Sequence, residues 1–131
     1  MDIVKQYATD KELETSGVWI DLGKGAKVLV ARLQNPAHKA RLREVLKPYK
    51  RKINRGVVDD EIPDDLINQV LAETILLNWE GIEENGSPVD YSVAKATEFL
   101  EKYPDFKADV VYLASNMETF RAQQAEEDEK N

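Results

Sequence analysis

Residues 17–33 read GVWIDLGKGAKVLVARL, and this stretch predicts a β-hairpin. Val18, Ile20 and Leu22 alternate with Trp19 and Asp21, as residues do in a strand with two different faces. Gly23-Lys24-Gly25 then interrupts the pattern, and residues 27–33 are rich in Val and Leu. Two short β-type runs around a glycine-containing loop are typical of an antiparallel hairpin.

A helix is predicted directly after the hairpin. Asn35-Pro36 is a typical helix start, because Asn accepts hydrogen bonds from the first turn and Pro loses no helical bond there. Pro48 lies inside the helical pattern, so we expect a kink or break at that point. Arg55-Gly56 is expected to end the helix. The apolar residues lie on one helical face: Leu42, Val45, Leu46, Tyr49 and Ile53.

The next predicted helix is expected to be the most buried element. It begins near Pro63, behind acidic residues that favour a helix N-terminus, and extends to Trp79. From Leu66 onward, apolar residues cover most of its circumference. Trp79 and Gly81 are expected to be structural, as a buried aromatic residue at the helix end and a tight-turn glycine.

Two more helices follow a connector over residues 81–92, GIEENGSPVDYS, which is rich in turn residues. Asp90 or Ser92 is expected to cap the first of these helices, which stops at Pro104. The last helix is expected to begin at Asp105. Its apolar stripe consists of Phe106, Val110, Leu113, Met117 and Phe120.

Length and composition fit one domain with its own core: the chain has 131 residues, of which 42% are hydrophobic. Residues 1–16 show no sustained period and are expected to be a loosely ordered lead-in, with one short helical turn near Asp10–Glu14. A single globular domain is expected over residues 17–120, followed by an acidic disordered tail over 121–131. The sequence thus predicts an α+β fold, a mostly α-helical single domain with an N-terminal β-hairpin.

Charge is unevenly distributed along the chain. Residues 39–55 carry a net charge of +7, whereas residues 56–131 carry −14 and the whole chain −7. Such a segment suggests contacts with acidic surfaces, including those of another copy, although a solvated helix face is equally typical of a charge run. We predict that the partner-binding or self-association surface is formed by Arg41, Arg43, Lys47, Lys50, Arg51, Lys52 and Arg55.

The residue inventory argues against an enzyme. The chain has no cysteine and one histidine, His38, which we expect to be exposed in the first turn of a helix. Neither Gly23-Lys24-Gly25 nor the acidic residues 59–65 match a phosphate-binding or calcium-binding loop. Glu80, Glu83 and Glu84 are expected to be open to water, where nothing separates their pKa values. We therefore predict no catalytic residue, no metal and no cofactor.

The N-terminus has no apolar signal segment, and no stretch is long enough to span a membrane, so we expect no membrane partner and a cytoplasmic location. The alternative function is a small nucleic-acid-binding or regulatory protein that uses the basic helix 39–55. Nucleic acid is the less favoured partner, because the acidic remainder repels a polyanion and Tyr49 is expected in the core.

Two passages resemble tail assembly chaperones of bacteriophages with long, non-contractile tails. They are VWIDLGKGAKVLVARLQNP, at residues 18–36, and LLNWEGIEENGSPVDYS, at residues 76–92. The resemblance runs over residues 17–120 in the order of helices and turns. The individual motifs, Trp79-Glu80-Gly81 and Asn35-Pro36 among them, are short, and their order makes the match specific.

The resemblance implies a non-enzymatic chaperone that acts in the host bacterial cytoplasm. Such proteins bind the tape measure protein during tail morphogenesis and are absent from the mature virion. Many have a longer, frameshifted form that engages the tail-tube protein, and this chain resembles the shorter form. The family supplies no site residues for this sequence, so the basic surface named above rests on charge alone.

Overall fold

The predicted hairpin forms two strands of a three-stranded sheet in the computed structural model, which describes residues 1–50 and 62–121. Strands β1 (Val18–Gly23) and β2 (Ala26–Val30) pair in antiparallel fashion, with Val18 opposite Val30. All three turn residues, Gly23 to Gly25, have positive φ angles, which glycine adopts without steric cost. The hairpin prediction is confirmed.

The prediction of one helix from Pro63 to Trp79 is wrong. Helix α5 (Asp64–Thr74) ends earlier, and strand β3 (Leu76–Glu80) follows it and pairs in antiparallel fashion with β2. The sheet therefore has the order β1-β2-β3. Trp79 is buried as expected, but on a strand.

A bulge in β3 explains why this run has the spacing of a helix. Leu29 lies opposite Asn78, whereas the next β2 residue, Val30, lies opposite Leu76, so β3 contains one additional residue. The additional residue allows Leu76 and Trp79 both to be buried, three positions apart. A short apolar run with that spacing fits a helix and a bulged strand equally well.

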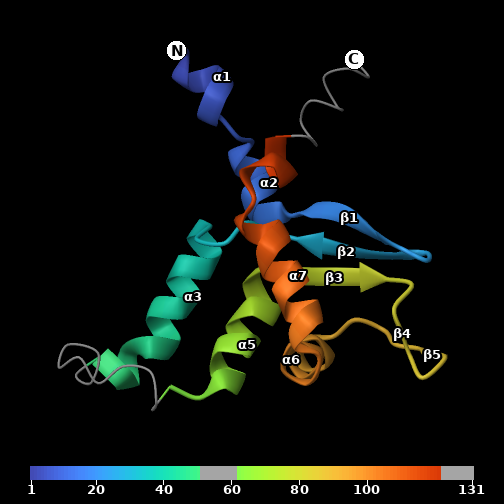
Figure 1. Ribbon diagram of the computed structural model, residues 1–131. Helices are drawn as coiled ribbons and strands as arrows, with labels where there is room; N and C mark the ends of the chain where they lie inside the picture. The colour runs from blue at the N-terminus through green and yellow to red at the C-terminus, as the bar shows by residue number, and fades with distance from the viewer. Residues whose placement is uncertain (51–61, 122–131) are drawn as a thin grey trace.

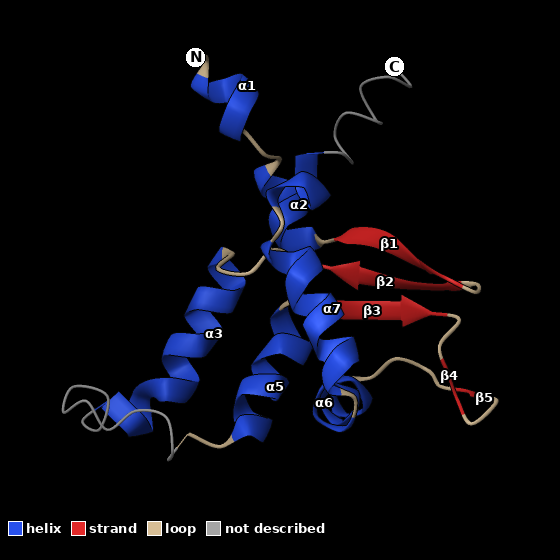
Figure 2. Ribbon diagram, viewed as in Figure 1, coloured by secondary structure: helices blue, strands red, loops and turns tan. Residues whose placement is uncertain are grey.

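The helices α5, α6 (Val93–Lys102) and α7 (Pro104–Ser115) enclose the core together with the sheet (Figure 1). Helix α3 (Pro36–Leu46) and the 3₁₀ helix η1 (Lys47–Tyr49) lie beside α5, at one side of the molecule (Figure 2). The predicted break at Pro48 is confirmed, because α3 ends at Leu46 and Pro48 lies in η1. The α+β fold class is confirmed as well.

Aromatic residues fill the end of the core that faces the connector. Trp79 stacks on Phe99 with ring centroids 5.3 Å apart and meets Tyr91 edge-on at 5.1 Å. Trp79 also donates its indole N–H to the carbonyl oxygen of Val89, 2.8 Å away. The connector therefore packs on the core through Trp79.

The connector contains a second, very short hairpin of β4 (Glu83–Glu84) and β5 (Ser87–Pro88). Its turn residues Asn85 and Gly86 have φ angles of 53° and 81°, as a tight hairpin turn requires. The Oγ of Ser92 accepts a hydrogen bond from the backbone N–H of Lys95 at 3.0 Å, so Ser92 is the cap of α6.

The last predicted helix is shorter than its apolar stripe. Helix α7 ends at Ser115, and Asn116 is extended with ψ of 115°, before helical geometry resumes at 117–121. The Oδ1 of Asn116 accepts from the N–H of Glu118 at 3.0 Å, so Asn116 caps this following turn. Phe120, on this turn, is nevertheless fully buried.

Two short helices precede the sheet. Helix α2 (Lys11–Ser16) lies where one helical turn is predicted, and α1 (Ile3–Tyr7) is an additional element. Glu14 of α2 is buried and forms an ion pair of 2.8 Å with Arg32. Burial raises the pKa of Glu14, but hydrogen bonds from Thr9 and Arg32 outweigh that effect and the net pKa is lowered. This carboxylate therefore attaches α2 to the end of β2.

Some predicted features lie outside the described residues. They are the helix end at Arg55-Gly56 with Ile53 before it, and the tail over 121–131 apart from Arg121.

Candidate partner-binding surface

Helix α3 begins at a well-formed N-terminal cap. Asn35 is buried, and its side-chain oxygen accepts from the backbone N–H of His38 at 3.0 Å. The amide group of Asn35 donates to the carbonyl oxygen of Arg32 at 2.8 Å, which fixes the cap to the end of β2. Pro36 occupies the first turn, as the sequence predicts. The direction of α3 is thus set by its first residues.

His38 is buried, so the prediction of an exposed histidine is wrong. Its side chain accepts a hydrogen bond at Nδ1 from the backbone N–H of Gln34, 3.0 Å away. Gln34 has a φ of 70°, and this left-handed residue turns the chain back over the imidazole. Burial lowers the pKa of His38. The sequence does not reveal this arrangement, because it depends on the conformation of one loop residue.

Arg41 differs in its surroundings from the other predicted surface residues. Its Nε lies 3.1 Å and 3.2 Å from the two carboxylate oxygens of Glu73 in α5, and its guanidinium also contacts Glu44 at 3.2 Å. The hydrogen bonds to Glu73 raise the pKa of Arg41. Arg41 therefore connects α3 to α5.

Three predicted residues, Arg43, Lys47 and Lys50, are exposed and line one groove. The remaining three, Arg51, Lys52 and Arg55, lie outside the described residues. The groove along α3 and η1 has a volume of about 430 Å³ and is lined by Lys39, Leu42, Arg43, Leu46, Lys47 and Lys50. We call this feature the α3 groove. Its cationic side chains surround an apolar floor.

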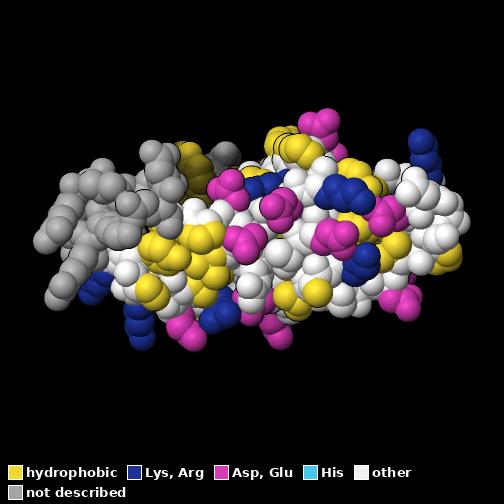
Figure 3. All heavy atoms as spheres, turned by 90° about the horizontal axis from the view of Figure 1, so that it is seen from below, with side chains coloured by type: hydrophobic (Ala, Val, Ile, Leu, Met, Phe, Trp, Pro, Cys, Tyr) yellow, Lys and Arg dark blue, Asp and Glu magenta, His cyan; other side chains and the backbone are white. Residues whose placement is uncertain are grey.

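The floor of the α3 groove consists of Leu42 and Leu46, which are half-buried. They belong to the apolar stripe that predicts the helix, but only part of their surface packs on the domain. Lys39 lines the groove as well, although it does not belong to the predicted surface. Lys39, Arg43 and Lys47 recur every fourth residue, and this spacing places them on one helical face. Figure 3 shows apolar side chains next to Lys and Arg at the end of the molecule where α3 lies.

The prediction that the glutamates near the connector are open to water with nothing to separate their pKa values is wrong for Glu84, whose side chain is 21% exposed. Glu84 accepts hydrogen bonds from the hydroxyl of Tyr103 at 2.6 Å and from the ammonium of Lys102 at 3.0 Å. The hydrogen bond from Tyr103 has the largest effect and the one from Lys102 the next largest, and both lower the pKa of Glu84. Glu80 lies 3.5 Å from the ammonium of Lys27. Both carboxylates thus have cationic partners.

Within residues 1–50 and 62–121, no helix combines the length and apolar character of a membrane-spanning segment. The same residues contain no cluster of three or more His, Cys, Asp or Glu side chains placed to hold a metal ion.

A family of prophage proteins matches most of the chain. The family model is described as YdaY prophage protein and covers residues 33–131, which include α3 and every later element. No curated protein and no solved structure matches the chain. The match begins at the loop that caps α3, so the α3 groove lies inside the family region. The chain belongs to the YdaY prophage protein family.

Proposed function

We propose that this prophage protein is a non-enzymatic phage tail assembly chaperone that binds the tape measure protein. The observation that carries the proposal is the α3 groove, where exposed Arg43, Lys47 and Lys50 surround Leu42 and Leu46. Membership of a prophage family supports a role in a phage. The resemblance of residues 17–120 to tail assembly chaperones supports the role of a chaperone in tail assembly.

The α3 groove suits a partner helix with an apolar face bordered by acidic residues. Binding of an amphipathic helix in a groove buries its apolar side chains, which supplies the affinity. The cationic rim then selects helices whose flanks carry Asp or Glu and repels those with Lys or Arg. A long helical protein can present such segments repeatedly, so that several copies of the chaperone cover it.

Under this proposal the chaperone acts in the host bacterial cytoplasm and is absent from the mature virion. A longer, frameshifted form would engage the tail-tube protein. The non-enzymatic role is supported by the single histidine of the chain, because the Nδ1 of His38 already accepts from Gln34 and the side chain is buried. A general base would need that nitrogen free to take a proton.

A co-purification experiment tests the proposal. The tape measure protein of the same prophage is co-expressed with the wild type and with the triple variant Arg43→Glu, Lys47→Glu, Lys50→Glu. We expect the triple variant to lose at least about tenfold in the amount of tape measure protein retained, because each reversal places an acid against an acidic partner flank.

The matched control is Lys24→Glu, Lys95→Glu, Lys107→Glu, which changes the net charge equally on other elements. It should retain the partner as the wild type does. Equal retention by both triple variants, or no retention by the wild type, contradicts the proposal. Detection of the chain by mass spectrometry of purified virions would instead indicate a structural tail protein.

The second candidate, a nucleic-acid-binding protein, is favoured by the exposure of Arg43, Lys47 and Lys50 along α3 and η1. Filter binding to duplex DNA at increasing salt separates the two functions. Binding through about three phosphate contacts would weaken with salt at a slope of about −2.7 in a double-logarithmic plot. Binding of this kind that the triple variant loses would favour the second candidate.

A further inference from the structure

Strand β1 is an edge of the three-stranded sheet, whose order is β1-β2-β3. Among the described residues, the backbone groups of Trp19, Ile20, Asp21 and Leu22 are hydrogen-bonded to no element other than β2. An edge strand turns alternate N–H and C=O groups away from its sheet, where another strand can bind them. In Figure 1, β1 forms the upper border of the sheet, and α2 lies only at its beginning. This edge is therefore open to pairing.

The opposite edge strand, β3, is engaged by its own chain. The backbone N–H of Trp79 donates to the side-chain oxygen of Asn78 at 2.8 Å. The hydroxyl of Tyr91 lies 2.8 Å from the carbonyl oxygen of Leu76. The connector of residues 81–92 follows β3 and packs on the core through Trp79. Pairing with another chain is therefore available at β1 rather than at β3.

Strand β1 also exposes apolar side chains. Trp19 is 40% and Leu22 is 39% exposed, and Ile20 is half-buried at the border of the core. Charged side chains commonly protect an edge strand from pairing, and β1 has one, Asp21. An open edge of this kind binds a further strand through its backbone, and the side chains determine which strand fits.

A second β1 strand fits this edge in one register. Side chains directly opposite each other in an antiparallel pair lie on the same face, so a two-fold axis passes a residue that faces its own copy. Because β1 extends over Val18–Gly23, five residues of each copy pair only when the axis lies at Ile20 or at Asp21. An axis at Asp21 places two carboxylates opposite each other, which is destabilising. The axis at Ile20 remains.

The Ile20 register places apolar residues opposite each other on the face that packs on the core. Ile20 faces Ile20 of the second copy, and Val18 faces Leu22 of the second copy. Within one chain, Val18 lies opposite Val30 and Ile20 lies opposite Val28, and both partners are fully buried. Each new pair therefore extends a row of apolar side chains across the two sheets.

The other face of this register is complementary in charge. Trp19 faces Asp21 of the second copy. Within one chain, the ammonium of Lys27 lies 5.9 Å from the centre of the Trp19 ring. Lys27 also lies 3.5 Å from Glu80, and its side chain is 51% exposed. The carboxylate of the second copy therefore approaches a ring beside a cation, and the two-fold symmetry repeats this contact.

We propose that β1 of one copy pairs in antiparallel fashion with β1 of a second copy, with Ile20 at the two-fold axis. The two sheets then join into one sheet of six strands. The contact is a single pair of strands, smaller than the about 800 Å² per partner of a standard interface, which predicts weak, concentration-dependent association. The proposal needs only this chain and does not depend on the tape measure protein.

Disulfide cross-linking tests the register, because the chain has no cysteine of its own. In Ile20→Cys the two thiols lie opposite each other, with Cα atoms about 4.5–5.5 Å apart, which suits a disulfide. In Asp21→Cys they lie diagonally, about 7–8 Å apart, which does not. We expect Ile20→Cys to form the linked dimer at least about tenfold faster than Asp21→Cys.

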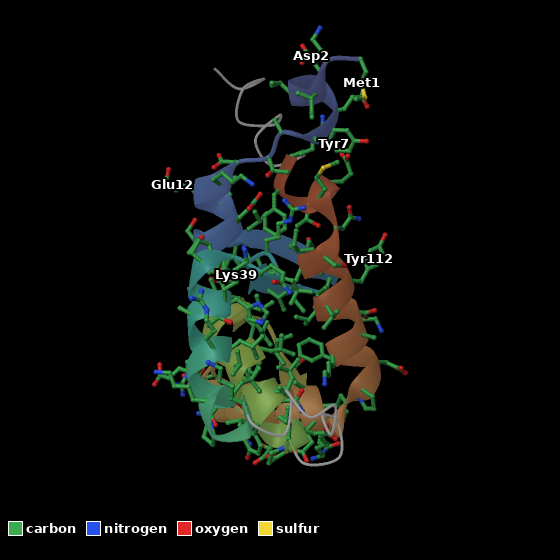
Figure 4. The ribbon with its side chains drawn as sticks, turned by 90° about the vertical axis from the view of Figure 1, so that its left-hand side faces the viewer. Met1, Asp2, Tyr7, Glu12, Lys39 and Tyr112 are labelled. Atoms are coloured by element: carbon green, nitrogen blue, oxygen red, sulfur yellow. The ribbon has the colours of Figure 1, made fainter. Side chains whose placement is uncertain are left out.

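Tyr112→Cys measures the rate of random collisions. Tyr112 is 64% exposed and points away from α7 (Figure 4), so its thiol is at least as accessible as one at Ile20. This variant should cross-link as slowly as Asp21→Cys. An Ile20→Cys variant that links no faster than Tyr112→Cys, or more slowly than Asp21→Cys, overturns the proposal.

Sedimentation velocity at increasing concentration tests the association of the full chain without a cross-link. Trp19→Glu places a carboxylate opposite Asp21 of the second copy, whereas Trp19→Lys places an ammonium there. The two variants lose the same ring, so we expect Trp19→Glu to associate at least about tenfold more weakly than Trp19→Lys. Tyr112→Glu changes the net charge as Trp19→Glu does and should associate as the wild type does.

Thermal melts verify that each variant is folded. A wild type that stays monomeric up to about millimolar concentration overturns the proposal, whatever the tape measure experiment gives. Equal association of Trp19→Glu and Trp19→Lys overturns it as well, because the sign of the charge at position 19 would then not matter.

Discussion

Gly81 is placed where the end of β3 meets the turn of the first hairpin. Its φ is 72°, and a Cβ atom there would lie only 2.1 Å from the carbonyl oxygen of Gly25. That oxygen belongs to the backbone and cannot move without displacing the turn. The glycine predicted after Trp79 is thus required for two reasons. Its positive φ disfavours other residues, and the backbone of Gly25 leaves no room for a side chain.

Substitution of Gly81 separates these two reasons. Gly81→Ala should lower the free energy of unfolding by about 2–4 kcal/mol, because it adds a steric clash to the cost of a positive φ. Gly86→Ala is the control, since Gly86 has a φ of 81° but nothing within 4 Å of the added atom, and it should cost about 1 kcal/mol. Urea denaturation measures both, and equal losses would contradict the clash.

Leu71 tests the core beneath the sheet. It is 6% exposed and lies in the cluster with Val28, Ile75 and Trp79. Leu71→Asp should unfold the protein or lower its stability by several kcal/mol, because an unpaired charge would be buried. Leu71→Met keeps the volume and should cost less than about 1.5 kcal/mol. A thermal melt of Leu71→Asp like that of the wild type would contradict this prediction.

His38 predicts a loss of stability at mildly acidic pH. Its pKa is lowered in the folded state, so the unfolded chain takes up a proton first as pH falls below about 6.5. The contribution of neutral His38 to the free energy of unfolding is complete above that pH. It decreases as the pH falls toward the pKa of His38 in the folded protein. His38→Asn keeps an acceptor for the N–H of Gln34 but does not titrate, so its stability should depend less on pH between about 7.5 and 5.5. Parallel urea titrations across this range measure the difference, and identical pH profiles would refute it.

At the level of elements, the features that depend on adjacent residues could be predicted from the sequence. Those that depend on contacts between distant residues could not. The hairpin, the cap at Asn35, the break at Pro48 and the cap at Ser92 each depend on a few adjacent residues. Strand β3 depends on pairing with β2, which a single sequence does not display, and its bulge imitates helical spacing. Half of the α3 groove could be predicted from charge, whereas the inward contact of Arg41 depends on the position of Glu73 on α5.

The link between α3 and α5 can be measured directly. Arg41 and Glu73 are about 30% exposed, with side-chain values of 31% and 27%, so their interaction is partly screened by water. A double-mutant cycle with Arg41→Met and Glu73→Gln should give a small favourable coupling free energy, reduced by solvent screening. Urea denaturation of the four proteins supplies the values, and a coupling near zero would mean that packing alone positions α3.

For the whole molecule, basic side chains gather in the α3 groove, whereas basic and acidic side chains alternate over other parts of the surface (Figure 3). The α3 groove lies at one side of the molecule and α1 projects from another end (Figure 1). Elsewhere acidic side chains are paired with basic ones, as in Lys27–Glu80, Lys95–Glu98 and Lys102–Glu84. A chain with net charge −7 would repel copies of itself if these charges were mixed evenly. The cluster of basic side chains in the α3 groove instead gives an acidic surface a local place to approach.

The contact of Arg121 with the backbone of Lys5 and Gln6 brings the beginning of the chain to position 121. A pair of fluorophores attached at residue 1 and at Glu118, whose carboxylate lies 3.4 Å from the guanidinium of Arg121, would therefore be close in space. Energy transfer between them would report the release of the N-terminal segment. In a Trp19→Phe background, the emission of the remaining tryptophan, Trp79, would report the melting of the interior. The two events could then be timed separately in one sample.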